Sequence, residues 1–233
     1  MIYFTYLEGK VARERLQIIT HVRSKLIEAF GNIIPDSYVG KNLVVEIGNP
    51  DFYYRYVSHF YPKVKEGDED QTFAQRSGIM CDDGYLQIVL NHQAKANLSV
   101  IVAHEMTHLF LAYYRPPLWL NEGLATIAET MFSRGRSQFM AGEDEYTDPW
   151  KWSKESFGDF LTGKLMRNPE ANFAFYKLSF MIVYQMLSEK VDLLLFLKAV
   201  KDKGDPETAL LEMTGKRVVD FASYMTPAET LSH

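Results

Sequence analysis

Two histidines and a glutamate stand close together in the stretch VAHEMTH, residues 102–108. His104 and His108 are four residues apart, and Glu105 directly follows the first of them. Residues four apart lie on one face of an α-helix, about 6 Å apart at the backbone. Two imidazoles placed in this way can converge on one Zn²⁺ at about 2.0–2.1 Å each. Glu105 would project beside that face, within reach of a water on the metal. The H-E-x-x-H pattern therefore predicts a zinc site on a helix.

A zinc ion that takes part in catalysis needs a third protein ligand and an open fourth position. A Pro-Pro pair ends the first predicted helix, and LWLNEGLATIAE, residues 118–129, begins another. A reversal of the chain at the prolines could bring Glu122 back against the histidines. Asn121 and Glu129 flank it and could act as outer groups that orient the ligands. The alternative is that Asn121 and Glu122 cap the helix or lie in water.

The combination of HEMTH with WLNEGLATIAE resembles the gluzincin metallopeptidases. In that family HExxH supplies two zinc ligands, and a glutamate in an N-E-G-x-A segment supplies the third. The likeness is greatest to the compact peptidase MA-like families, which share P-x-W-L-N-E-G-L-A after a short gap. The resemblance covers residues 100–130 and implies a zincin-like fold with one Zn²⁺ per chain. It implies that His104, His108 and Glu122 bind the zinc and that Glu105 is the general base.

One segment departs from the aminopeptidase branch of this family. Those enzymes carry G-x-M-E-N on the strand before HExxH, and its glutamate holds the free amine of the substrate. The matching region here reads DGYLQIVLNH, residues 83–92, without such a glutamate. We therefore expect hydrolysis of internal peptide bonds rather than aminopeptidase action.

A zinc peptidase also needs a hydrogen-bond donor for the oxyanion that develops on the substrate. Tyr176, followed three residues later by Ser179, resembles the Y-x-x-G or Y-x-x-S segment in which related enzymes place a tyrosine. Tyr184 on the same predicted helix is the alternative. Both tyrosines could instead fill the core, because this helix is rich in aromatic residues.

The strand predicted over residues 85–90 is expected to form the edge of the sheet above the cleft. An extended peptide or protein substrate would pair with that edge by β-augmentation. Tyr85, Gln87 and Val89 are the substrate-binding residues that this arrangement predicts.

Two other interpretations of the motif stay open. The chain could bind zinc without cleaving peptides and serve as a binding or regulatory module on a peptidase fold. It could also be a metal-free helical domain in which both histidines bond to backbone carbonyls. Cys81 is a further candidate ligand, but no cysteine or histidine lies at ligand spacing from it.

The elements that must position these residues fall into two groups along the chain. Aromatic and β-branched runs predict strands at 2–7, 43–47, 73–80 and 85–90, with a helix at 10–30 and a short aromatic helix after residue 50. The Asp-Gly step at residues 83–84 predicts a hairpin between the last two strands. From residue 95 helical patterns dominate, at 96–114, 118–134, 150–166, 169–188, 190–202 and 206–225.

These patterns predict one α+β domain over residues 1–233, and the resemblance to the gluzincins implies that it is a zincin-like catalytic domain. Its small mixed-sheet lobe would span about 1–94 and its helical lobe about 95–233, with the active-site helix between them.

Composition limits the partners that the chain can have. A length of 233 residues, 47% hydrophobic content and a formal net charge of −5 describe a folded protein without a basic stripe. We therefore expect no nucleic-acid partner.

No run reaches the roughly 18–20 apolar residues of a membrane span. The N-terminal residues lack an export signal pattern, which favours a cytoplasmic location, although a trimmed leader would leave the same sequence. Composition does not predict an oligomeric state.

Overall fold

The computed structural model divides the chain into two units, the first with mixed α and β structure and the second with helices in its described residues. The units are Met1–Phe110 and Leu111–His233. The described residues are 1–36, 42–60, 77–82, 85–92, 97–133 and 152–222.

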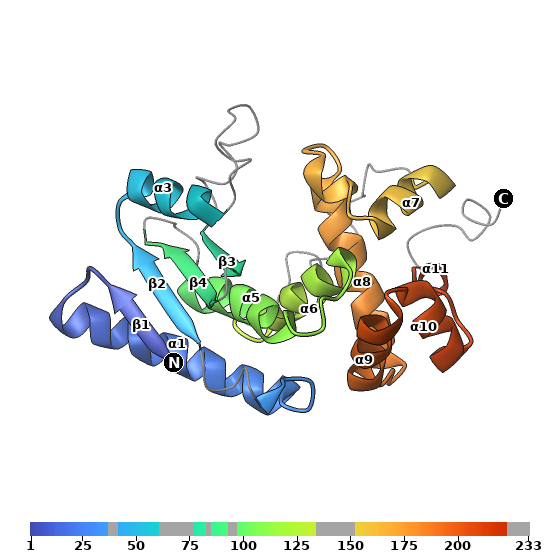
Figure 1. Ribbon diagram of the computed structural model, residues 1–233, viewed down its shortest axis with the longest axis horizontal. Helices are drawn as coiled ribbons and strands as arrows, with labels where there is room; N and C mark the ends of the chain where they lie inside the picture. Colours follow the sequence, from blue (N-terminus) through green and yellow to red (C-terminus); the bar gives the residue numbers. More distant parts are fainter. Residues whose placement is uncertain (37–41, 61–76, 83–84, 93–96, 134–151, 223–233) are drawn as a thin grey trace. The chain divides into compact units, whose positions relative to one another are not determined.

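The first unit contains a four-stranded mixed sheet with helices on both faces (Figure 1). Its strand order is β1-β2-β4-β3, in which β1, β2 and β4 are parallel and β3 is antiparallel to β4. The elements are β1 (Ile2–Thr5), α1 (Gly9–Phe30), β2 (Leu43–Ile47), α3 (Pro50–Phe60), β3 (Gly78–Asp82), β4 (Leu86–Asn91) and α5 (Leu98–Leu111).

Alternate residues of the strands point to opposite faces of this sheet. On one face Glu46 of β2 pairs with Arg15 of α1, and Gly78 of β3 lies against α5. Helices α1 and α5 therefore cover the same face. On the other face Tyr53 of α3 packs in one cluster with Val89 of β4.

The second unit is helical and is organised around one long helix, α8. Helix α8 packs against α6, η2 and α11. The elements are α6 (Leu118–Thr130), α7 (Lys154–Leu161), the 3₁₀ helix η2 (Leu165–Arg167), α8 (Asn172–Ser188), α9 (Leu193–Lys203), α10 (Pro206–Thr214) and α11 (Val218–Phe221).

The α+β class, the helix after β1, the strand at 43–47 and the antiparallel pairing of β3 with β4 are confirmed. The Asp-Gly step predicted to join β3 and β4 lies outside the described residues. The prediction of one long helix over 206–225 was wrong, because Gly215 adopts a left-handed backbone with φ 73° and ends α10. The helix predicted over 150–166 is likewise shorter, since Gly163 has φ 76° just beyond α7. Within the described ranges no helix has the length and apolarity needed to cross a bilayer.

Candidate metal centre

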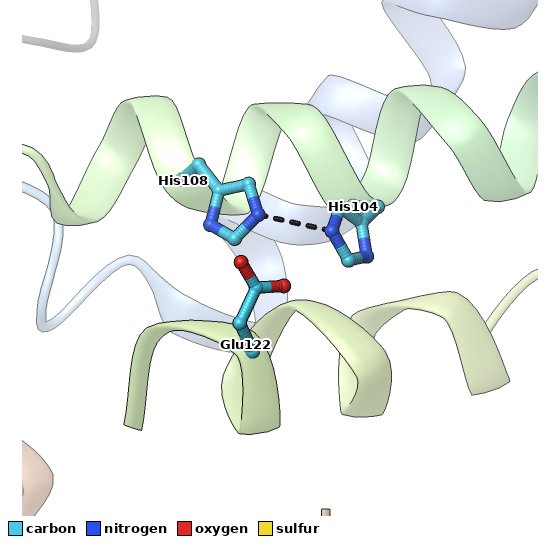
Figure 2. A group of neighbouring side chains, drawn as sticks. All are labelled: His104, His108 and Glu122. Atoms are coloured by element: carbon cyan, nitrogen blue, oxygen red, sulfur yellow. Dashed lines mark hydrogen bonds between the residues drawn. The ribbon is translucent and has the colours of Figure 1, made fainter. Parts of the chain in front are cut away.

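His104 and His108 project from the same side of α5 (Figure 2). Asn97 begins this helix, since its side-chain oxygen accepts a hydrogen bond from the backbone N–H of Ser99 at 3.0 Å. The two Nε2 atoms are 2.9 Å apart, and the rings stand nearly perpendicular at 86°. The spacing of four residues therefore brings the two imidazole nitrogens together, as the sequence predicts.

Glu122 projects from α6 toward the two imidazoles (Figure 2). Its side chain is buried, and it lies in the second turn of a helix that starts directly after Pro117. One ligand atom from each of His104, His108 and Glu122 lies within 4.8 Å of the other two. The structure thus brings together the three side chains expected to bind a metal.

The chemistry of these three groups suits a divalent cation. Two imidazoles and one carboxylate form a donor set that zinc accepts in catalytic sites, with a further position left open. Two nitrogens at zinc-ligand distance in a tetrahedral site lie about 3.3 Å apart, so the two rings would separate by only a few tenths of an ångström. The group could therefore hold a metal ion after small side-chain adjustments.

Glu105 is buried on α5 beside the first histidine. Its position depends on Gly78 at the start of β3. A Cβ atom at Gly78 would lie 2.7 Å from Cγ2 of Ile101 and 3.1 Å from Cγ of Glu105. Because residue 78 has no side chain, α5 can approach the sheet closely. The Cγ atom of Glu105 then packs against the backbone of Gly78.

Gly123 plays a similar part directly after the third predicted ligand. A Cβ atom there would lie 2.5 Å from the backbone oxygen of Ser179 and 2.6 Å from Cγ2 of Val183, both on α8. A backbone atom cannot move aside as a flexible side chain can. Helix α6 therefore lies as close to α8 as a glycine permits, and this contact fixes the segment that carries Glu122.

The other residues predicted near the metal lie on α6 and α8. Asn121 is half-buried, and its Oδ1 has no hydrogen-bond partner among the described residues. Glu129 is half-buried seven residues after Glu122 on the same helix. Tyr176 is half-buried on α8, whereas Tyr184 is 45% exposed and stacks on Phe180. The roles of Asn121, Glu129 and Tyr176 stay predictions.

The prediction that strand 85–90 forms the sheet edge was wrong. Strand β4 lies between β2 and β3 and pairs with both, so its backbone is not open to a substrate. Gln87 accepts a hydrogen bond from Tyr56 of α3, and Val89 is buried in the cluster beneath that helix. Tyr85 precedes the strand and is 79% exposed. The described strands that pair on one side only are β1 and β3.

A second polar cluster, which the sequence did not point to, lies where α1 meets the sheet. The buried carboxylate of Glu46 pairs with Arg15 and with Nδ1 of His92, the latter at 2.8 Å. It also accepts a hydrogen bond from the hydroxyl of Tyr3. Burial and the contact with Glu46 raise the pKa of Tyr3 to about 12. A buried carboxylate needs such partners, and this cluster anchors α1 to β1 and β2.

Cys81, the remaining candidate ligand, lies outside the metal-binding group. Its side chain is buried on β3 in the cluster under α3. Burial, with a smaller contribution from the charge of Glu105, raises the pKa of the thiol to about 12.

Comparisons of the chain with protein-family models, with curated proteins and with solved structures find no match.

Proposed function

We propose that this chain is a zinc-dependent peptidase of the gluzincin type. The observation that carries the proposal is the convergence of His104, His108 and Glu122 within 4.8 Å. The glutamate directly after the first histidine adds a candidate acid–base group that is not itself needed as a ligand. A metal ion held by the three side chains would supply a Lewis acid that activates water for attack at neutral pH.

Two side chains of the protein would carry out the proton transfer and the stabilisation of the oxyanion. The carboxylate of Glu105 accepts a proton from the attacking water and then donates it to the leaving amine nitrogen. The hydroxyl of Tyr176 donates a hydrogen bond to the oxyanion that forms on the substrate carbonyl. Burial of Glu105 and Glu122 strengthens electrostatic interactions relative to those in bulk water.

Strand β3 replaces β4 as the proposed docking edge for an extended peptide. It lies at one side of the described sheet, and its first residue, Gly78, lies against Ile101 and Glu105 of α5. A peptide paired with β3 would bind mainly through main-chain hydrogen bonds. Such a mode does not require a free amine at the substrate terminus and is compatible with cleavage of internal bonds.

The substitution Glu105→Gln tests the catalytic part of the proposal. It keeps the shape of the side chain but removes its ability to accept a proton. We expect zinc content to stay at the wild-type level while hydrolysis of a peptide library falls at least about a hundredfold. A wild-type chain that holds zinc yet cleaves no peptide would support the alternative of a zinc-bearing binding module. Full activity of Glu105→Gln would contradict the proposed role of this residue.

A further inference from the structure

The two faces of the sheet are covered unequally by the described helices. Helices α1 and α5 lie on one face, as the pairing of Arg15 with Glu46 and the contact of Gly78 with α5 establish. The opposite face carries α3, which packs over β3 and β4 through Tyr53 and Val57. Among the described residues no second helix covers the β1 and β2 half of that face.

This half of the face is apolar and accessible. Ile2 and Phe4 of β1 are each 61% exposed, and Phe4 lies beside Val45 of β2 in the parallel register. Val45 and Ile47 are half-exposed, whereas Val44, on the other face, is fully buried. Exposed apolar surface that continues across two strands is typical of an interaction site.

A hollow of about 550 Å³ follows the boundary between β2 and α3. Its lining, here called the α3 groove, consists of Val45, Ile47, Phe52, Arg55, Tyr56, His59 and Phe60. The aromatic residues 52, 56 and 60 repeat every four positions and form a row along the helix. The basic residues 55 and 59 form a second row beside it.

The charge in this groove is of one sign only. No aspartate or glutamate is among its lining residues. The backbone oxygen of Arg55 accepts a hydrogen bond from the hydroxyl of Ser58 at 3.1 Å, but its guanidinium forms no hydrogen bond or ion pair with any residue in the described part of the chain. The hydroxyl of Tyr56 is engaged with Gln87 at 2.8 Å, so its ring is held as part of the wall. An occupant of this groove needs an apolar surface with acidic groups beside it.

We propose that the α3 groove is a docking site for an amphipathic helix of a partner protein, with acidic residues flanking its apolar stripe. Two strands about 4.8 Å apart present a width of about 10 Å, which is the diameter of a helix. The partner helix would fill the place of a second helix beside α3. Acidic residues four apart on its flank would face Arg55 and His59, which have the same spacing. This inference goes beyond the proposed peptidase function and does not depend on it.

The test measures the binding of two fluorescein-labelled helical peptides by fluorescence anisotropy. Both are 14 residues long with leucine at positions i, i+3, i+4 and i+7. One carries glutamates on the flank of that stripe and the other carries lysines. We expect the wild-type chain to bind the glutamate peptide about tenfold more tightly, because the guanidinium of Arg55 attracts a glutamate on the flank of the peptide and repels a lysine there.

Charge reversal in the groove gives the decisive comparison. The double variant Arg55→Glu/His59→Glu should reverse the preference and bind the lysine peptide more tightly. Arg13→Glu is the control, since Arg13 is an exposed residue of α1, on the other side of the sheet. Phe52→Asp should weaken both peptides, and Phe52 is 60% exposed, so its replacement leaves the buried core intact.

Three results would overturn the proposal. Wild-type chain that binds neither peptide at millimolar concentration shows that the groove takes no such helix. Equal affinities that the double variant leaves unchanged show that the basic row does not select the ligand. A dimer in sedimentation experiments that Phe52→Asp dissociates would assign the groove to a second copy of the chain.

Discussion

The substitution Gly123→Ala tests whether the packing of α6 on α8 holds the third metal ligand in place. The added Cβ atom would lie 2.5 Å from the backbone oxygen of Ser179, whereas an ordinary contact is at least 3.4 Å. The two helices must therefore separate locally by about 0.9 Å to accept the methyl group. Metal–ligand distances in working sites vary by only about 0.2 Å. Glu122, the adjacent residue, cannot keep its position under such a shift.

Two quantities should change together in this variant. Overpacking of a tight helix contact costs about 1–3 kcal/mol, so urea denaturation of the zinc-free chain should show a loss of that size. Zinc affinity, measured by competition with a chromophoric chelator, should fall about 10- to 100-fold, as when an outer group that orients a ligand is lost.

Gly158→Ala is the matched control for this experiment. Gly158 lies within α7 of the same unit, and a Cβ atom there would meet nothing within 4 Å. This variant should gain up to about 1 kcal/mol in helix stability and keep the zinc affinity of the wild type. The reasoning is refuted if Gly123→Ala destabilises the chain yet binds zinc as tightly as the control does.

Three further predictions concern other parts of the chain. Gly78→Ala should lower the peptidase rate about 10- to 100-fold with zinc content unchanged, because its Cβ would displace Glu105; an unaltered rate in a steady-state assay would contradict this. The thiol of Cys81, with its pKa raised to about 12, should react with a disulfide reagent at pH 8 at least about a hundredfold more slowly in the folded chain than in guanidinium. Burial raises the pKa of Glu207, so the folded chain binds the carboxyl proton more tightly than the unfolded chain does. The stability that this protonated carboxyl contributes is present below the ordinary pKa near 4.5 and is lost as the pH rises through the raised pKa of the folded state. Glu207→Gln should remove this loss, so that the unfolding free energy of the variant rises relative to that of the wild type as the pH increases above about 4.5. A difference between the two chains that stays constant with pH in urea titrations would refute this.

The metal-binding group was the part of the site that the sequence predicted best. The spacing of His104 and His108 is a local property of a helix, so it follows from the sequence once the helix is assigned. The placement of Glu122 needed more, namely a chain reversal at the prolines. The structure agrees with both expectations at the level of a group that could hold a metal ion.

Strand order was the feature that local sequence could not supply. The apolar run at 85–90 predicts an edge strand, but β2, which comes from a distant part of the chain, pairs with it in parallel. A strand whose two faces are both buried is apolar whether it pairs with one neighbouring strand or with two. The proposed docking edge is therefore β3 rather than β4, because Gln87 and Val89 lie on a strand that is paired on both sides.

The close contacts that other elements make with the backbone of two glycines could not be predicted from the sequence either. Gly78 and Gly123 looked like ordinary glycines, yet each lies where a side chain would collide with a neighbouring element. Glu46 gave no signal either, since its partners Arg15 and His92 come from separate segments. In α1, Val11 and Leu16 match the apolar period but are 48% and 40% exposed, whereas Ile19, Val22 and Leu26 are fully buried.

The central claim is that His104, His108 and Glu122 bind one metal ion, and zinc stoichiometry tests it most directly. The purified chain would be incubated with excess zinc, desalted and measured by elemental analysis, beside the variants His104→Ala and Glu122→Ala. We predict about one zinc ion per wild-type chain, a chelator-induced fall in the melting temperature, and loss of the metal in both variants. Wild-type chain without zinc after this treatment, or variants that retain it in full, would contradict the account.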